Sequence, residues 1–258
     1  MIRCPICLEP LHQDKPKRCY ACANRHSFDV AKEGYINLLR NQPDAGDNKQ
    51  MIQARHAMMN TTLFQPLMNR LVELLTPYQL SSLLDAGCGE GTYLRTITSK
   101  LSLTAIGIDI SKNAIRLAAK QDSKGLYLVA SNYQLPLLDN SVDGIINIFA
   151  PHCEDEFIRV SKQLIMKVVP ATHHLIEIKQ QLYDEVVITQ PKIVRFPHFS
   201  LIHEEELEYS MFCTDIATLI QMTPFYYTTN DKRLQLTTNE MDITLHFHLY
   251  CYVREVNP

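Results

Sequence analysis

The segment SSLLDAGCGEGTYLRTI, residues 81–97, contains the pattern that predicts the fold of this chain. A short apolar run ends at Asp85, three glycines follow at alternate positions, and a helix-like segment comes next. A strand, a glycine turn and a helix in this order make the first unit of a doubly wound α/β sheet, whose ligand lies at the carboxyl ends of the strands. We therefore expect a ligand site directly after Asp85.

The spacing of Gly87, Gly89 and Gly91 distinguishes among cofactors. A dinucleotide-binding turn reads G-x-G-x-x-G, and the third glycine here comes one residue early. A P-loop needs a lysine after its last glycine, whereas Thr92 follows Gly91. The pattern D-x-G-x-G-x-G instead resembles the first motif of class I S-adenosylmethionine-dependent methyltransferases. In that family the glycines admit the methionine part of the cofactor, and the acid at the strand end orients its amino group.

The following segments agree with this fold class. LTAIGIDIS, residues 103–111, ends a second strand near Asp109, eighteen residues after Gly91, where a carboxylate can accept both ribose hydroxyls. Residues 125–149 supply a third strand, a loop and a fourth strand. In the methyltransferase pattern Ser131, Asn132 and Tyr133 flank the adenine. The sequence thus predicts an α/β, Rossmann-like class I methyltransferase sheet, doubly wound, with a small N-terminal zinc-binding module.

The zinc-binding module is predicted from CPIC, residues 4–7, and RCYACANRH, residues 18–26. A C-x2-C turn lets two thiolates hold one zinc ion. The second ligand pair is either Cys19 with Cys22 or Cys22 with His26, which leave spacers of eleven and fourteen residues after Cys7. Both sets are physically reasonable. Because a module of about thirty-five residues cannot bury enough core to fold unaided, we expect one structural zinc ion.

The composition is that of a globular protein, with 46% hydrophobic and 21% charged residues. No stretch of about eighteen apolar residues could span a bilayer, and MIRCPICLEP lacks the apolar core of a signal peptide. We therefore expect a cytoplasmic protein without a membrane partner, whose eight cysteines are thiols or metal ligands rather than disulfides.

The charge is unevenly distributed along the chain. The net charge is −3, yet residues 1–40 hold seven basic and four acidic residues and so carry +3. A polar segment rich in Pro, Gly, Asn and Asp follows this basic head. We divide the chain into a zinc-binding RNA-recognition module (1–40), a linker and start of a helix (41–60), and a methyltransferase domain (61–258). A helical stretch over residues 51–75 should break near Pro66.

The segment after the fourth strand, IFAPHCEDEF at residues 148–157, restricts the chemistry. It lacks the N/D-P-P-Y/F motif of exocyclic-amine methylation. Cys153 lies two residues after Pro151, but its neighbours do not match a cytosine-5 enzyme, so we interpret it as an ordinary thiol. His152, Glu154 and Asp155 could take a proton, although charged residues also open helices for dipole reasons. No catalytic residue is assigned.

Nearly the whole chain resembles one family, the bacterial 23S rRNA guanine-N1 methyltransferases that modify a loop guanine in hairpin 35 of domain II. The segments that carry this resemblance are CPIC, RHSFDVAKEGYINLL (25–39), MIQARHAMM (51–59), LDAGCGEG (84–91) and QMTPF (221–225). The second of these is the most specific, because nothing in the chemistry of zinc sites or methyltransferases requires it.

The resemblance implies particular ligands. The zinc site would be Cys4, Cys7, Cys22 and His26, with Cys19 left out. The cofactor would contact Gly89 and Glu90, the ring at position 64 and His174, and the motif adds Asp85, Gly87, Gly91, Asp109, Asn132 and Tyr133. Phe64 stands where the resemblance leads us to expect a tyrosine, and RVSKQL (159–164) replaces the usual Pro-Gly-Gly turn before strand five. His173 is the neighbouring alternative to His174.

The implied reaction is transfer of the methyl group of S-adenosylmethionine to N1 of a guanine in a hairpin loop of 23S rRNA. We expect Lys15, Lys17, Arg18 and Arg25 to contact RNA phosphates, and the resemblance implies a homodimer. Two alternatives are a small-molecule methyltransferase, which would not need the zinc-binding module, and a non-catalytic rRNA-binding protein with a relic cofactor pocket.

Overall fold

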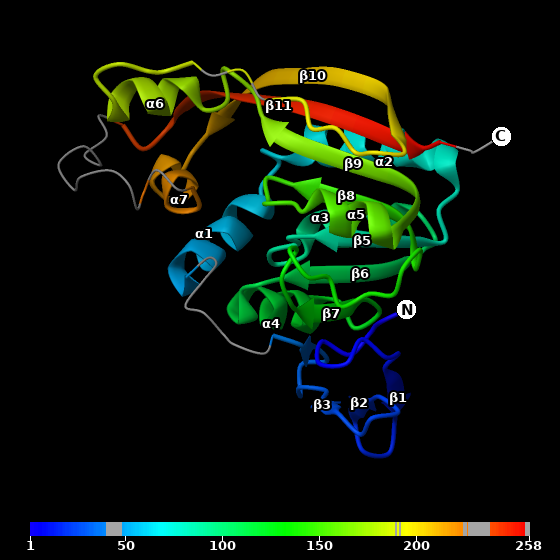
Figure 1. Ribbon diagram of the computed structural model, residues 1–258. Coiled ribbons are helices and arrows are strands. Elements are labelled where there is room, and N and C mark those ends of the chain that lie inside the picture. The colour runs from blue at the N-terminus through cyan, green and yellow to red at the C-terminus, as the bar shows by residue number, and fades with distance from the viewer. Residues whose placement is uncertain (40–47, 189, 191, 224–225, 227–237, 256–258) are drawn as a thin grey trace.

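The computed structural model describes residues 1–39, 48–188, 190, 192–223, 226 and 238–255 (Figure 1). The predicted linker at 41–60 therefore lies partly outside the described residues, as do Pro224 and Phe225 of the QMTPF segment. Within the described ranges, no helix is both long and apolar enough to cross a membrane.

A large mixed sheet forms the centre of the molecule. Its strands among the described residues, in spatial order, are β10 (Phe199–Cys213), β11 (Met241–Arg254), β9 (Ser161–Pro170), β8 (Val142–Ile148), β5 (Ser82–Ala86), β6 (Thr104–Asp109), β7 (Leu126–Val129) and β4 (Ile36–Asn37). The strands from β9 to β4 pair in parallel, and β10 and β11 pair antiparallel. The predicted α/β class I methyltransferase sheet is confirmed.

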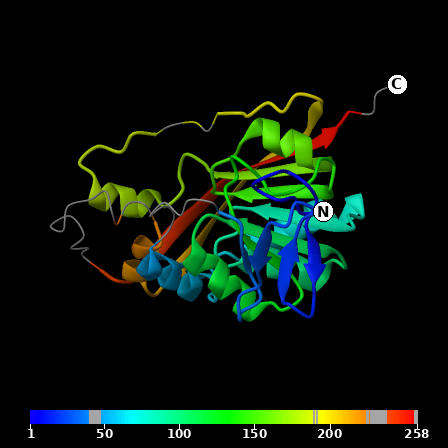
Figure 2. The ribbon, with the colours of Figure 1, turned by 60° about the horizontal axis from the view of Figure 1, so that its bottom comes forward.

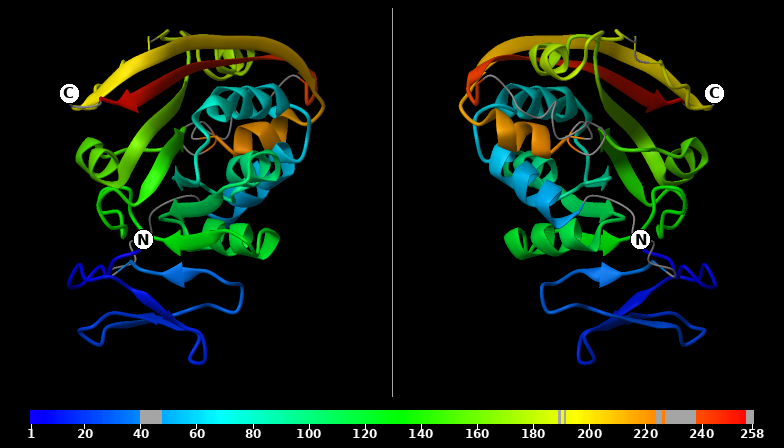
Figure 3. Two further views of the ribbon diagram at one scale, coloured as in Figure 1. Left: turned by 90° about the vertical axis from the view of Figure 1, so that its right-hand side faces the viewer. Right: turned by 90° about the vertical axis from the view of Figure 1, so that its left-hand side faces the viewer.

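Helices cover mainly one face of this sheet (Figure 3). They are α1 (Lys49–Met59), α2 (Gln65–Leu75), α3 (Thr92–Lys100), α4 (Lys112–Gln121) and α7 (Ile216–Gln221). Their buried apolar residues belong to one core cluster with strand side chains of this face; Leu71, Ile97 and Leu83 are examples. The break in the helical stretch falls between α1 and α2. Pro66 lies in the first turn of α2, where backbone N–H groups have no partner within the helix, so proline costs no hydrogen bond there.

The opposite face packs against α5 (Glu154–Val160), the N-terminal module and the segment that follows α6 (Figures 2 and 3). The helix α6 itself spans Ile176–Leu182. Phe157 of α5 and Phe196 stack with ring centroids 6.3 Å apart, and Phe196 meets Tyr252 of β11 edge to face. The hydroxyl of Tyr252 donates to the carbonyl of Val194 at 2.6 Å, which fixes the segment that carries Phe196.

The N-terminal module is joined directly to the sheet. It contains three short antiparallel strands, β1 (His12–Asp14), β2 (Cys19–Ala21) and β3 (Ser27–Asp29), and lies beside β7 (Figure 1). β4 leaves this module and pairs with β7, placing Ile36 opposite Leu128. The backbone N–H of Arg3 donates to the carbonyl of Pro136, and that of Leu138 to the carbonyl of Met1. The module therefore docks through backbone bonds as well as apolar contacts.

The chain order creates a crevice at the end of β5. From β5 the chain proceeds to β6 on one side, and it later returns to β8 on the other side. Open α/β sheets bind ligands at such a switch point. Gly87 has a φ of +89°, and a Cβ there would stand 2.3 Å from the Cβ of Ala150, so only glycine fits beneath the loop that follows β8.

Candidate functional site

Four predicted zinc ligands lie together in the N-terminal module. The Sγ atoms of Cys4, Cys7 and Cys22 and one ring nitrogen of His26 all lie within 4.8 Å of one another. Cys4 Sγ and Cys22 Sγ lie 3.5 and 3.4 Å from His26 Nδ1, and Cys7 Sγ lies 3.6 Å from Cys22 Sγ. Zinc bonds of about 2.3 Å to sulfur and about 2.0 Å to nitrogen in a tetrahedron separate the ligand atoms by about 3.5–3.8 Å, so the four side chains fit one zinc ion.

Cys19, the alternative left open by spacing, is not part of this group. It begins β2 and is buried, so it packs as a small apolar residue. His26 completes the group because the turn after β2 folds back: the backbone N–H of Cys22 donates to the carbonyl of His26 at 3.0 Å.

At the switch point, Asp85 is buried at the end of β5 with an exposed fraction of 1%. Its Oδ2 accepts no hydrogen bond from the described residues, and neither does the buried Oδ1 of Asn132. Burial raises the pKa of Asp85 well above its usual value, and the carboxylates of Asp109 and Glu90 raise it further. Two buried acceptors without donors are therefore available to a ligand that carries N–H groups or positive charge.

Asp109 shapes the glycine loop from the end of β6. Its Oδ2 accepts the backbone N–H of Gly89 at 2.9 Å, and its Oδ1 accepts that of Ser111 at 2.7 Å. Each carboxylate oxygen has a second lone pair, so acceptance of ribose hydroxyls remains compatible with these bonds. The predicted contact of Asp109 with ribose stays a prediction.

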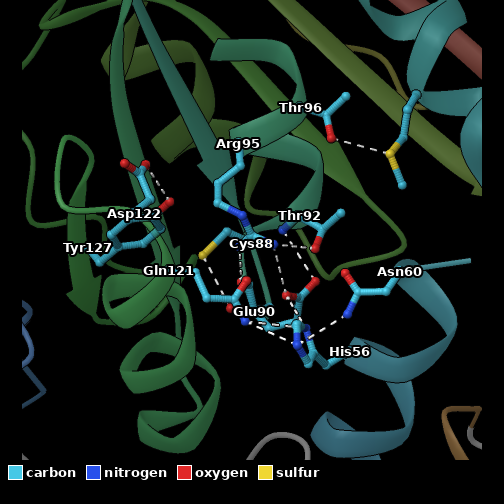
Figure 4. A network of polar contacts seen from close by, with 12 residues as sticks. His56, Asn60, Cys88, Glu90, Thr92, Arg95, Thr96, Gln121, Asp122 and Tyr127 are labelled. Atoms are coloured by element: carbon cyan, nitrogen blue, oxygen red, sulfur yellow. Dashed lines mark hydrogen bonds and ion pairs between the residues drawn. The ribbon is translucent and has the colours of Figure 1, made fainter. Parts of the chain in front are cut away.

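Glu90 is held by side chains from two helices (Figure 4). Its Oε2 lies 3.2 Å from His56 Nδ1 of α1 and 3.5 Å from Arg95 Nη2 of α3, and its carbonyl accepts from Arg95 Nη1 at 2.8 Å. The amide nitrogen of Gln121, at the end of α4, lies 3.2 Å from His56 Nε2 and 3.4 Å from His56 Nδ1. The sequence motif identified Glu90 but not His56, Arg95 and Gln121, because these residues come from helices that only the fold brings together.

An aromatic cluster lies at the end of β8. Phe149 has a φ of +55° and is 40% exposed as a residue, and His174 stacks on its ring with centroids 6.2 Å apart. Phe247 of β11 packs against both rings. Phe64, which the resemblance assigns to the cofactor, is buried at the start of α2 and meets Phe247 at 6.4 Å. Phe64 and His174, two of the residues that the resemblance assigns to cofactor binding, therefore lie in this cluster.

The structure separates the two neighbouring histidines. His174 turns into the aromatic cluster, and its Nδ1 accepts the backbone N–H of His246 at 3.3 Å. Burial lowers the pKa of His174 to about 3, which keeps the ring neutral. His173 turns outward and is half exposed, with its Nδ1 at 3.4 Å from Glu208. The geometry therefore favours His174 over His173 as the residue that faces the crevice.

The other predicted side chains differ in exposure. Asn132 lies beside Gly87, and its Nδ2 donates to the carbonyl of Pro151 at 2.9 Å, which joins the loops after β7 and β8. Tyr133 is 65% exposed at the rim. The assignments of the glycine loop and of these two residues to the cofactor stay predictions.

Sequence reasoning missed a buried lysine next to the crevice. Lys167 of β9 donates through Nζ to Asn147 Oδ1 of β8 at 2.7 Å, and Asn147 Nδ2 donates to the carbonyl of Ala86 at 2.7 Å. Burial lowers the pKa of Lys167 to about 8. This chain of bonds ties the end of β5 to β8 and β9. An unusual lysine inside an apolar strand, LIMKVV, was the available signal.

Comparison with known proteins agrees with this geometry. A family model described as the N-terminal zinc ribbon of RlmA matches residues 2–43, and a methyltransferase-domain model matches residues 84–166. The 23S rRNA (guanine(748)-N(1))-methyltransferase of Streptomyces fradiae is 30% identical over 220 residues, which cover 80% of this chain and 78% of that protein. The chain belongs to the 23S rRNA guanine-N1 methyltransferase family.

Two further relatives carry a provisional assignment to the same activity. The protein of Micromonospora griseorubida is 33% identical over 205 residues, covering 70% of this chain and 69% of its own. YxjB of Bacillus subtilis (strain 168) is 30% identical over 196 residues, covering 72% and 70%. The YcgJ protein from Bacillus subtilis shares the fold alone, with 15% identity, a TM-score of 0.50, and coverage of 74% of this chain and 98% of that one.

The two predicted cofactors follow from family membership and fit the residues present. The methyltransferase domain is S-adenosylmethionine-dependent, and the zinc ribbon holds a three-cysteine, one-histidine cluster. Asp85 Oδ2 and Asn132 Oδ1, which accept no hydrogen bond from the described residues, suit the ammonium and amine groups of S-adenosylmethionine.

For the zinc ribbon, we expect the Cys19→Ser variant to retain one zinc ion per chain, because Cys19 lies outside the ligand group. The His26→Ala variant should lose zinc to a chelator much faster, since three ligands remain. Zinc measured by mass spectrometry after chelator dialysis distinguishes the variants. Loss of zinc from Cys19→Ser at the rate of His26→Ala would contradict the assignment.

For the crevice, we expect Asp85→Asn to weaken S-adenosylmethionine binding about 10- to 100-fold, the value of one hydrogen bond to a charged group. The folded chain binds the Asp85 proton more tightly than the unfolded chain, so this group makes wild-type stability fall as pH rises above about 4. The variant should therefore gain stability relative to wild type as the pH rises above about 4. Calorimetry and urea unfolding measure the two effects.

Asp143 provides the matched control, because it lies near the start of β8, at the end of the parallel strands that faces away from the crevice. Its Oδ2 accepts the backbone N–H of Ser81 at 2.9 Å, and its Oδ1 pairs with Lys162 at 3.0 Å, so these contacts hold its pKa below the usual value. Asp143→Asn should lower stability by about 1 kcal/mol at neutral pH and leave cofactor affinity unchanged. Equal losses of affinity in both variants would refute the role of Asp85.

Proposed function

We propose that the chain transfers the methyl group of S-adenosylmethionine to N1 of a guanine in a hairpin loop of 23S rRNA. The observation that carries this proposal is the presence, in one chain, of both modules that the family combines: a zinc ribbon and a cofactor crevice. The long matches to relatives of this activity support the choice of RNA over a small molecule.

The crevice supports positioning of a base. When bound, S-adenosylmethionine supplies an electrophilic methyl group on sulfur. The half-exposed ring of Phe149 offers a stacking surface for a guanine released from its loop. Neutral His174, whose Nδ1 is already an acceptor, keeps a proton on Nε2 and can donate one hydrogen bond there. In-line placement of the reacting atoms would supply much of the rate enhancement.

The proton on guanine N1 must leave before or during methyl transfer. His152, considered from the sequence, packs with its ring against Phe157 and Phe196, and burial lowers its pKa. Asp155 and Glu154 open α5, and the neighbouring Glu156 is bound by Arg159 at 2.8 Å. These contacts give α5 a structural role. We therefore name no side chain as the acceptor of the guanine N1 proton.

The N-terminal module is the proposed RNA clamp. Lys15, Lys17 and Arg18 lie on the turn between β1 and β2, and Arg25 lies on the turn of the zinc ligands at the other end of β2. All four side chains are exposed. Arg3, by contrast, is directed at Glu156 and Asp139 of the large domain, at 3.6 and 4.0 Å. The exposed four are therefore accessible to a nucleic acid.

The proposed domain boundaries are 1–40, 41–60 and 61–258. Because Ile36 and Leu38 are buried among strand residues of the large sheet, deletion of residues 1–40 would also remove an edge strand. Charge substitutions are therefore a cleaner test of RNA recognition than deletion. A homodimer, implied by the resemblance, and a cytoplasmic location, expected because the sequence lacks a signal-peptide core and a bilayer-spanning stretch, belong to the same proposal; light scattering tests the former.

Mass-spectrometric mapping of methylated guanines tests the activity. A strain that lacks the protein should lose one N1-methylguanine from 23S rRNA, and the purified chain should restore it in the presence of S-adenosylmethionine. An unchanged map would refute the proposed substrate. Cofactor binding without methyl transfer to the isolated rRNA would favour the non-catalytic alternative.

For the clamp, we expect substitution of all four exposed basic residues by glutamine to weaken hairpin RNA binding. The slope of log affinity against log salt concentration should become shallower by about 0.7–0.9 for each RNA phosphate that the variant no longer neutralises. S-adenosylmethionine affinity should stay unchanged. Fluorescence anisotropy over a salt series measures the RNA affinity and its slope, and calorimetry measures the cofactor affinity.

The control removes four exposed lysines at the end of the sheet where the parallel strands begin: Lys100, Lys120, Lys124 and Lys162. Their substitution by glutamine changes net charge by the same amount. An equal reduction of affinity and slope in this control would show a general effect of charge and refute a clamp at the zinc ribbon.

A further inference from the structure

A row of histidine and glutamate side chains lies on β10 and β11, outside the cofactor crevice. We name it the His–Glu ladder. Its members alternate along the strands and share one face of the sheet: Glu204, Glu206 and Glu208 of β10, His246 and His248 of β11, and His173 of the loop after β9. Neither the zinc ribbon nor the methyl-transfer site uses these residues.

The contacts within the ladder are continuous. His248 Nε2 lies 2.9 Å from Glu204, and its Nδ1 lies 3.7 Å from Glu206. His246 Nε2 lies 3.3 Å from Glu206, and its Nδ1 lies 3.8 Å from Glu208. Glu208 reaches His173 Nδ1 at 3.4 Å through its other oxygen.

We propose that His173, Glu208 and His246 form a second metal site, separate from the zinc ribbon, that binds a divalent transition-metal ion such as Zn²⁺. Their ligand atoms all lie within 4.8 Å of one another. Metal bonds of about 2.0–2.1 Å in a tetrahedron separate nitrogen and oxygen ligands by about 3.3 Å. Glu208 Oε1 lies 3.4 Å from His173 Nδ1, close to this value, and Glu208 Oε2 lies 3.8 Å from His246 Nδ1. Because different oxygens make these two contacts, metal binding would require the carboxylate and the two rings to move closer together.

The orientation of His246 suits a ligand. Its side chain is 2% exposed, and Glu206 at Nε2 favours the tautomer that places the proton there, leaving the lone pair of Nδ1 toward Glu208 and His173. A carboxylate on the far nitrogen of a metal-binding histidine fixes the ring and raises its basicity. The lone pair of Nδ1 accepts the backbone N–H of His173 at 3.2 Å, and metal binding would exchange this contact for a coordinate bond.

The charge of the ladder favours a cation. Within the part of the chain that the structure describes, the ion-pair partners of Glu204, Glu206 and Glu208 are all histidines. With neutral imidazoles, these three carboxylates lie in a row that forms no ion pair with a lysine or arginine of the described residues. Two imidazoles and one carboxylate suit Zn²⁺, Ni²⁺ or Co²⁺ better than Mg²⁺ or Ca²⁺, which prefer oxygen ligands.

Three ligands from three segments would fix the loop after β9. His173 lies in this loop, Glu208 in β10 and His246 in β11. The next residue in the loop, His174, stacks on Phe149 in the aromatic cluster. An ion would therefore hold the backbone that carries His174, while the remaining coordination positions stay open to water.

Calorimetry with Zn²⁺ on the full chain, loaded beforehand with one zinc ion in the ribbon, tests the site. Wild type should bind one additional Zn²⁺ per chain. His173→Ala and Glu208→Gln should weaken this second binding at least tenfold, and circular dichroism should show both variants folded, because each side chain is about half exposed. Wild type that binds no additional ion, or variants that bind like wild type, would overturn the proposal.

His203 provides the matched control. It lies on the same strand and also pairs with a glutamate, Glu205 at 2.8 Å, but Glu205 faces Arg70 of α2 on the other side of the sheet. His203→Ala should leave the second ion in place. Co²⁺ added to the zinc-loaded chain should give d–d absorption without thiolate charge-transfer bands, whereas such bands would show exchange into the ribbon and refute a separate site.

Discussion

The carboxyl group of Asp85 is fully enclosed at the end of the central strand, and one of its oxygens accepts no hydrogen bond from the described residues. Enclosing such a group is unfavourable, and Asp109 and Glu90 nearby add repulsion. The surrounding structure tolerates this because β6 and β8 hold β5 on both sides and Asn147 bonds the carbonyl of Ala86. A cationic ligand offsets the unfavourable free energy of burying this carboxyl group. The same burial that lowers the stability of the fold therefore makes the site select for a cationic ligand.

The glycine loop follows from this constraint. To pass over the end of β5 the chain needs left-handed conformations at Gly87, Gly89 and Gly91, with φ of +89°, +55° and +83°. Asp109 holds the loop from β6, and His56 and Arg95 hold Glu90 from two helices. The site is therefore shaped by residues from segments far apart in sequence, and its precision depends on the packing of the whole helical face.

The sequence allowed the sheet, the glycine turn and the zinc module to be predicted, because each depends on local spacing that only a few structures satisfy. Sequence spacing could not distinguish Cys19 from His26 as the fourth zinc ligand, because either residue is near enough to Cys22 in sequence to complete a tetrahedral site. The fold of the turn after β2 determines that His26 joins the ligand group. Likewise, nothing local distinguishes His173 from His174. The partners of Glu90, the Lys167–Asn147 bond and the His–Glu ladder depend on strand register and helix packing, which a single sequence does not specify.

The pairing of β4 with β7 has a consequence for the order in which the protein is made. The zinc ribbon is synthesised before the large domain, and its metal ligands are complete once residue 26 has emerged. Its docking surface, however, includes residues 128–138, which are synthesised about a hundred residues later. A nascent chain would thus carry a folded, metal-loaded zinc ribbon that has not yet packed against the large sheet. The basic residues of this ribbon would then be able to bind RNA before the methyltransferase domain has folded.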